Sequence, residues 1–163
     1  MNRRSIFTLS AIATLGLGLP PSSVAQQGSL REQLVGTWAL VSCEPAAAAY
    51  CANPNGTLML APTGRYAQMI AAPGRPKTNA AAGALANRAD VTPDYYKAIA
   101  QGLVANFGTW SVNEADKTLT RKFEGALFPN VEGTEPKESI SLTGDELKLS
   151  GSAVGASVWR RVK

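Results

Sequence analysis

The chain has 163 residues and a net charge of +4, with 16 Lys and Arg against 12 Asp and Glu and no histidine. The basic residues are scattered and their excess is small, so nothing favours a nucleic-acid or acidic partner. The absence of histidine excludes Ser–His–Asp and Cys–His catalytic arrangements, and it removes the group most suited to acid–base chemistry near neutral pH.

The N-terminal 25 residues are typical of an export signal. Arg3-Arg4 precedes an uncharged apolar run, Ile6 to Leu19, and Ser23 to Ala25 offers small residues at a cleavage site. A membrane-spanning helix is the alternative, but it needs roughly 20 apolar residues and this run is shorter. We expect cleavage near Ala25 and location in the periplasm or outside the cell. The general secretory route is favoured, with the twin-arginine route left open.

Removal of this segment lowers the net charge from +4 to +2 and leaves residues 26–163, enough for one domain with a single core. No later stretch could span a bilayer, so we expect no integral membrane segment in the mature protein. We also expect no nucleic-acid partner and no cofactor.

The two cysteines, Cys43 and Cys51, are expected to form a disulfide, because exported chains meet an oxidising compartment. The bridge would close a short loop. A metal site is the alternative, but the chain has neither histidine nor a third cysteine to complete a tetrahedral set, so no metal is predicted.

The mature chain is predicted to begin with a short helical turn followed by three strands. Ser29 and Glu32 have the spacing of a capping box at the start of a helical turn. An apolar run from Leu34 to Cys43 predicts a first strand. Two further strands, 56–61 and 65–70, flank a Pro-Thr-Gly turn and form a hairpin.

The middle of the chain differs in character. Residues 71–91 are rich in Ala, Pro and Gly, and we interpret them as a lid or a mobile loop. Thr92-Pro93-Asp94 is a helix start, and apolar residues at three- and four-residue spacing predict a helix over Pro93 to Ala105 with one face packed on the domain.

The second half returns to period two. Strands are predicted over residues 107–112, 117–124, 137–142, 146–150 and 157–162. With the first three strands, this makes about eight short strands in meander order, which favours an all-β barrel or sandwich with one helix inserted after the third strand.

Several short motifs, in order along nearly the whole mature chain, resemble the bacterial and fungal lipocalin-like domain family. They are Leu34-Val35-Gly36-Thr37-Trp38-x-Leu40-Val41-Ser42, Pro62-x-Gly64-Arg65-Tyr66, Phe107-Gly108-Thr109-Trp110, Phe128-Pro129-Asn130-x-x-Gly133-Thr134, Leu142-x-Gly144-Asp145-x-Leu147-x-Leu149 and Trp159-x-Arg161.

The resemblance implies an eight-stranded up-and-down antiparallel barrel of the calycin type, with a small hydrophobic ligand as its partner. It also implies a barrel closure at Gly36 and Trp38 of the first strand, in which Trp38 lies across the closed base and Arg161 or Arg160 stacks on the indole. An ordinary core tryptophan with surface arginines is the alternative.

An eight-stranded barrel has room inside for side chains or for one small ligand. Period-two alternation predicts an inward or mouth-facing set: Leu40, Leu58, Tyr66, Gln68, Trp110, Arg121, Phe123 and Ile140. The alternative is the opposite set on some strands, because a shift of one residue in register reverses the face. Among the first set we expect Tyr66, Gln68, Trp110, Arg121 and Phe123 to contact a ligand. Core packing of the aromatic residues and exposure of Arg121 is the alternative. The glutamates Glu124, Glu132, Glu135 and Glu138 are predicted to lie on the solvated surface.

These inferences give one leading hypothesis and two alternatives. The leading one is an exported barrel that binds a small apolar or amphipathic molecule, with no catalytic residues assigned. The first alternative is an isomerase or cyclase that works without histidine, and a buried carboxylate or arginine in the cavity would favour it. The second is an envelope scaffold, for which a filled barrel with an exposed apolar patch would be evidence.

Overall fold

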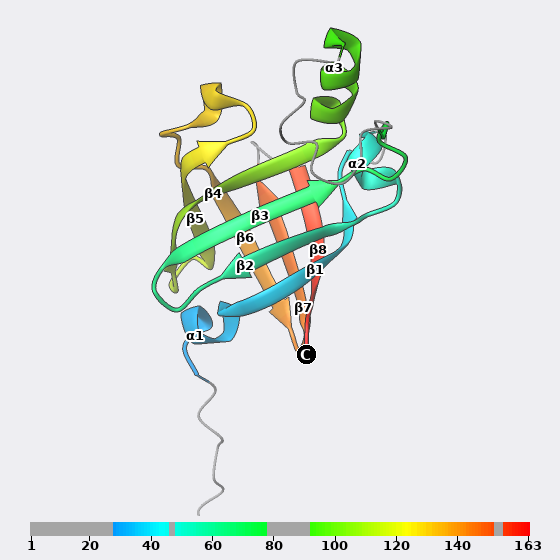
Figure 1. Ribbon diagram of the computed structural model, residues 1–163. Helices are drawn as coiled ribbons and strands as arrows, with labels where there is room; N and C mark the ends of the chain where they lie inside the picture. The colour runs from blue at the N-terminus through cyan, green and yellow to red at the C-terminus, as the bar shows by residue number, and fades with distance from the viewer. Residues whose placement is uncertain (1–27, 46–47, 78–91, 152–154) are drawn as a thin grey trace, which may run out of the picture.

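The computed structural model describes residues 28–163, apart from 46–47, 78–91 and 152–154. Its strands form a closed antiparallel barrel in chain order, in which the last strand pairs with the first (Figure 1). The predicted eight-stranded up-and-down barrel is therefore confirmed. The strands are β1 Gly36–Cys43, β2 Gly56–Leu60, β3 Arg65–Ala71, β4 Leu103–Asn113, β5 Thr118–Ala126, β6 Lys137–Thr143, β7 Glu146–Gly151 and β8 Gly155–Arg161.

The helices mark the two ends of the barrel. Helix α1 (Leu30–Leu34) and the C-terminus lie at one end, whereas α2 (Ala49–Ala52), α3 (Pro93–Gln101) and the 3₁₀ turn Pro129–Val131 lie at the other (Figure 1). We call these the closed end and the open end. Helix α1 has the capping box predicted for Ser29 and Glu32. Among the described residues, no helix is long and apolar enough to cross a membrane.

Alternation along the strands places the core inside the barrel. All eight residues predicted to face inward or the mouth are buried, including the polar Gln68 and Arg121. Hydrophobic side chains from all eight strands meet in this core, which confirms the predicted parity of the strands.

The closed end is built around Trp38. This side chain is fully buried, and its Nε1 donates a hydrogen bond to the carbonyl of Leu34 at 2.9 Å. Of the two arginines considered, Arg161 covers the ring, with Cζ 4.1 Å from the ring centroid, whereas Arg160 is exposed. Gly36 leaves the space that this requires, because a Cβ there would lie 2.8 Å from Nη1 of Arg161 and the backbone φ is +141°.

The guanidinium of Arg161 also ties the end of the chain to its beginning. It donates to the carbonyl of Val35 at 2.9 Å and to the carbonyl of Gln33. Asp145 lies beside it, 3.7 Å from Nε, and also pairs with Lys163 at 2.9 Å. The hydrogen bond from Lys163 lowers the pKa of the Asp145 carboxyl. Strand β8 is thereby held to α1 across the barrel base.

The inserted helix differs from its prediction. Helix α3 does follow the third strand, but it ends at Gln101 and the next strand starts at Leu103. Residues 103–105 instead pair with β3, because pairing with a neighbouring strand overrides a local helical spacing of side chains. The predicted apolar face is only partly packed: Tyr95 and Ile99 are half-buried, and no residue of the helix is fully buried.

Two further predictions lie outside the described residues. The export signal falls within residues 1–27, and most of the segment interpreted as a lid falls within 78–91.

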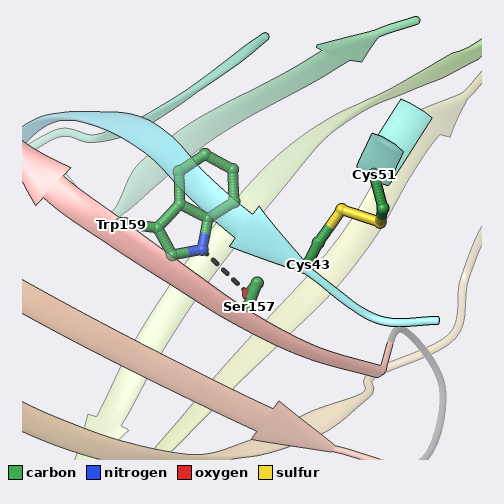
Figure 2. The surroundings of a disulfide bond; sticks show 4 residues. All are labelled: Cys43, Cys51, Ser157 and Trp159. Carbon is green, nitrogen blue, oxygen red and sulfur yellow. Dashed lines mark hydrogen bonds between the residues drawn. A yellow bond between two sulfur atoms is a disulfide. The ribbon is translucent and has the colours of Figure 1, made fainter. Parts of the chain in front are cut away.

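The predicted disulfide is confirmed. Cys43, at the end of β1, is bonded to Cys51 in α2, with the two Cα atoms 5.2 Å apart (Figure 2). Both cysteines are buried in the core cluster, so the bridge fixes α2 over the open end of the barrel.

Removing this disulfide is expected to lower the stability of the barrel without unfolding it. Closure of a ring this short restricts the unfolded chain by about 2–3 kcal/mol. The double substitution Cys43→Ala with Cys51→Ala should therefore lower the free energy of unfolding by that amount in urea titrations. The reduced wild type is the control. An oxidised wild type no more stable than the reduced protein would contradict this expectation.

Candidate site in the open half of the barrel

A cavity of about 330 Å³ occupies the open half of the barrel. Its wall is mainly apolar and is drawn from strands on all sides, with Ile70, Phe123, Leu149 and Trp159 among its side chains. The indole of Trp159 is held in place by a 2.9 Å hydrogen bond from its Nε1 to Oγ of Ser157, and both side chains lie close to the disulfide (Figure 2). The barrel is therefore hollow in this half.

Four of the polar side chains that line the cavity are buried: Gln68, Asn106, Arg121 and Glu138. None of them is more than 8% exposed. Buried polar groups cost free energy unless they are paired, so a cluster of this kind is informative about what the cavity holds.

The centre of the cluster is an ion pair between Arg121 and Glu138. Nε of Arg121 lies 2.7 Å from Oε2 of Glu138, and the two side chains are 2% and 1% exposed. Nη1 of Arg121 donates to Oε1 of Gln68. The guanidinium carbon lies 5.5 Å and 5.7 Å from the ring centroids of Tyr66 and Phe123. The arginine charge is thus balanced by one carboxylate, one amide oxygen and two aromatic faces.

Strand parity explains how this cluster forms. Leu119, Arg121 and Phe123 alternate on the inner face of β5, as Glu138 and Ile140 do on β6. The pairing of β5 with β6 continues for one more hydrogen bond beyond its regular residues, in which the amide of Arg121 donates to the carbonyl of Pro136 at 3.1 Å. This contact brings the arginine alongside Glu138.

Three buried polar atoms of the described chain have no hydrogen-bond partner: the hydroxyl of Tyr66, Oδ1 of Asn106 and Oε1 of Glu138. Two of them belong to residues that line the cavity. Unpaired buried acceptors are rare in folded proteins, and they mark places where a bound group can complete the pairing.

The structure separates the five residues predicted to contact a ligand. Gln68, Arg121 and Phe123 line the cavity, whereas Tyr66 and Trp110 are not among its lining residues. Trp110 belongs to the closed end: its Nε1 donates to the carbonyl of Ala61 at 3.0 Å, and the guanidinium carbon of Arg31 lies 4.7 Å from its ring centroid.

Sequence reasoning missed three residues of the site. Glu138 was predicted on the surface, and this is wrong because its side chain is almost fully buried. Its parity with Ile140 on one strand was the signal that could have found it. Asn106 shares the inner face of β4 with Trp110, and Trp159 lies on the inner face of β8 between the outward-facing neighbours Val158 and Arg160.

Tyr66 gives the barrel a dependence on alkaline pH. Burial raises the pKa of its phenol far above the ordinary value of about 10. Its neutral form is favoured in the folded state, so its stabilising contribution is complete below pH 10 and is lost as the pH rises beyond it. Each unit above pH 10 should cost up to about 1.4 kcal/mol through this group.

The measurement is the free energy of unfolding between pH 9 and 11.5 for the wild type and for Tyr66→Phe. The variant should show the shallower decline, and it should lose little stability at pH 7 because the hydroxyl has no partner. Parallel declines in the two proteins would refute the assignment.

The described part of the chain contains no group of three or more His, Cys, Asp or Glu side chains that could hold a metal ion. The site itself is an apolar cavity that holds one buried ion pair and two buried acceptors without hydrogen-bond partners.

Comparisons with known proteins agree with the architecture. The family model described as a lipocalin-like domain matches residues 35–161, which include every strand of the barrel. A search of curated proteins finds no match.

Proposed function

The chain belongs to the lipocalin-like domain family, and from this premise we propose that it binds a small apolar or amphipathic molecule inside the barrel. The observation that carries the proposal is the 330 Å³ cavity in the open half, with its apolar wall and its few buried polar groups. Small-molecule sites typically start at about 300 Å³ and combine apolar walls with a small number of oriented polar side chains. The cavity volume suits a molecule of one or two rings or a short chain.

The hollow interior also argues against the scaffold alternative. That hypothesis expected side chains to fill the barrel, with an apolar patch outside. Exposed apolar side chains do occur on the outer face of β2, β3 and β4, namely Met59, Met69 and Phe107. These side chains lie outside the barrel and do not explain the cavity. A cavity lowers the packing density of the interior, and a barrel that served only as a scaffold would gain nothing from it.

Binding can be tested with N-phenyl-1-naphthylamine, a neutral probe that fluoresces in apolar surroundings. We expect a saturable rise in emission at one probe per chain. The substitution Ala126→Trp should abolish it, because Ala126 lines the cavity opposite Asn106 and an indole there would fill the space.

The matched control is Lys122→Trp, on the exposed face of the same strand. It should bind the probe like the wild type, provided that circular dichroism shows both variants folded. Non-saturable emission in the wild type, or equal binding by both variants, would overturn the proposal.

A second candidate, an isomerase that works without histidine, is favoured by one observation. Oε1 of Glu138 is a buried, unpartnered carboxylate oxygen in the lining of the cavity. There it could accept a proton from the carbon between a carbonyl and a double bond and return it to the far carbon of that double bond, so that the double bond moves and the carboxylate is restored. Conversion of 3-cyclohexenone to 2-cyclohexenone, followed by ultraviolet absorbance, tests this. Glu138→Gln should lose the conversion and retain probe binding. No conversion above the buffer rate by the wild type would exclude the candidate for this reaction class.

We also propose that the protein is exported. The disulfide supports this, because such bonds persist mainly in oxidising compartments. Fractionation of the native host should place the protein outside the cytoplasm with its first residue near position 26. A full-length cytoplasmic protein would contradict export.

A further inference from the structure

The two unpartnered acceptors in the cavity restrict the chemistry of the ligand, whereas the cavity volume restricts only its size. Oε1 of Glu138 and Oδ1 of Asn106 are each buried without a donor, in side chains that are 1% and 8% exposed. A carboxylate without its proton offers acceptors only, so no rotation of Glu138 can turn Oε1 into a donor. A ligand that brings a donor would supply the missing hydrogen bond.

The charge of the cluster limits which donor fits. Arg121 is matched by Glu138, and its guanidinium is further occupied by Gln68 and by the faces of two aromatic rings. A ligand carboxylate would therefore meet an arginine already neutralised and a second carboxylate beside it, in surroundings where like charges repel strongly. The cluster as a whole is neutral, which favours a neutral ligand.

We infer that the ligand is a neutral hydroxyl compound, a phenol or alcohol on an apolar skeleton, whose O–H donates to Oε1 of Glu138 or Oδ1 of Asn106. Its skeleton occupies the space walled by Phe123, Leu149 and Trp159. This inference rests on the proposed binding function and narrows it, since it excludes fatty-acid carboxylates and pure hydrocarbons as the preferred cargo.

Three compounds of one skeleton test the inference by displacing the naphthylamine probe. 4-Pentylphenol can donate, its methyl ether 4-pentylanisole can only accept, and 4-pentylbenzoate carries a negative charge at pH 7. We expect the phenol to displace the probe at a concentration about tenfold lower than the ether, as one hydrogen bond to a buried acceptor would give. The benzoate should be weaker than the phenol by at least the same factor.

Two variants then locate the acceptor. Asn106→Leu removes Oδ1, and the paired change Arg121→Met with Glu138→Leu removes Oε1 without leaving an unpaired charge. The advantage of phenol over ether should fall to about twofold or less in at least one of them. Asn55→Leu is the control, because Asn55 is exposed and does not line the cavity. It should keep the tenfold advantage.

The possible outcomes separate a failure of the hydroxyl inference from a failure of the proposed binding function. Equal displacement by phenol and ether, or a benzoate as good as the phenol, with saturable probe binding intact, would overturn the hydroxyl inference and leave the proposed function standing. A phenol advantage that survives in both variants would also overturn it. Absence of saturable probe binding in the wild type would instead overturn the proposed function.

Discussion

Replacing Arg121 by Met is expected to lower the free energy of unfolding by about 3–5 kcal/mol, because Glu138 would remain buried without its partner. The loss should be measured by urea unfolding at pH 7. The added substitution Glu138→Leu should recover most of it, since two apolar side chains of similar size pack in the barrel without the cost of burying charge.

The chain offers a matched control for this prediction. Arg65 and Glu124 form an equally short pair at 2.6 Å, but their side chains are 50% and 35% exposed. Arg65→Met should therefore cost less than about 1 kcal/mol. Similar losses for Arg65→Met and Arg121→Met would contradict the view that burial makes the inner pair sensitive to the loss of one partner.

The second large effect is expected at the closed end. Trp38→Ala should lower the free energy of unfolding by about 3–5 kcal/mol, because a fully buried indole leaves a cavity and a carbonyl of Leu34 without its donor. Thermal and urea unfolding, compared with Trp38→Phe as the smaller change, measure the effect. A loss below about 1 kcal/mol for Trp38→Ala would show that the barrel base does not depend on this side chain.

Neighbouring arginines provide a second comparison at the same end. Arg161→Met removes the contact with the Trp38 ring and the hydrogen bonds to the carbonyls of Gln33 and Val35, and it should cost about 1–3 kcal/mol. Arg160→Met changes an exposed side chain on the same strand and should cost almost nothing. Both variants should bind the naphthylamine probe like the wild type, since neither residue lines the cavity.

The barrel could be predicted from sequence because its strands alternate clearly and its turns are short. Parity assigned Leu58, Gln68 and Arg121 to the interior, and all three are buried. The cysteine pair could also be predicted, because only one intramolecular disulfide is possible with two cysteines.

The residues of the site were harder to predict. Alternation along a strand tells which face a side chain is on, but it does not tell how far along the barrel axis that side chain lies. Trp110 and Asn106 share the inner face of β4, yet they lie four residues, about 13 Å, apart along it. One contributes to the closed end and the other to the cavity. Height depends on the stagger of each strand against its neighbours, which only the assembled sheet defines.

Glu138 shows a second limit. A glutamate next to lysine in a short strand is usually solvated, and the balance changes only when an arginine from another strand faces it. The partner here, Arg121, is 17 residues away in the sequence. The regular pairing of β5 with β6 covers only residues 118–120 and 137–139, so it stops just before Arg121. The end of α3 was mispredicted for the same reason. Residues 103–105 pair with β3, and a contact between distant parts of the chain is not visible in the local sequence pattern.

Binding of a hydroxyl compound inside the barrel can be observed in a crystal structure of the protein with 4-pentylphenol. We expect the pentyl chain and ring in the open half of the barrel against Phe123, Leu149 and Trp159. The hydroxyl should lie within about 3 Å of Oε1 of Glu138 or Oδ1 of Asn106. A phenol bound only on the outer face over Met59, Met69 and Phe107, above an interior closed by its own side chains, would contradict this expectation.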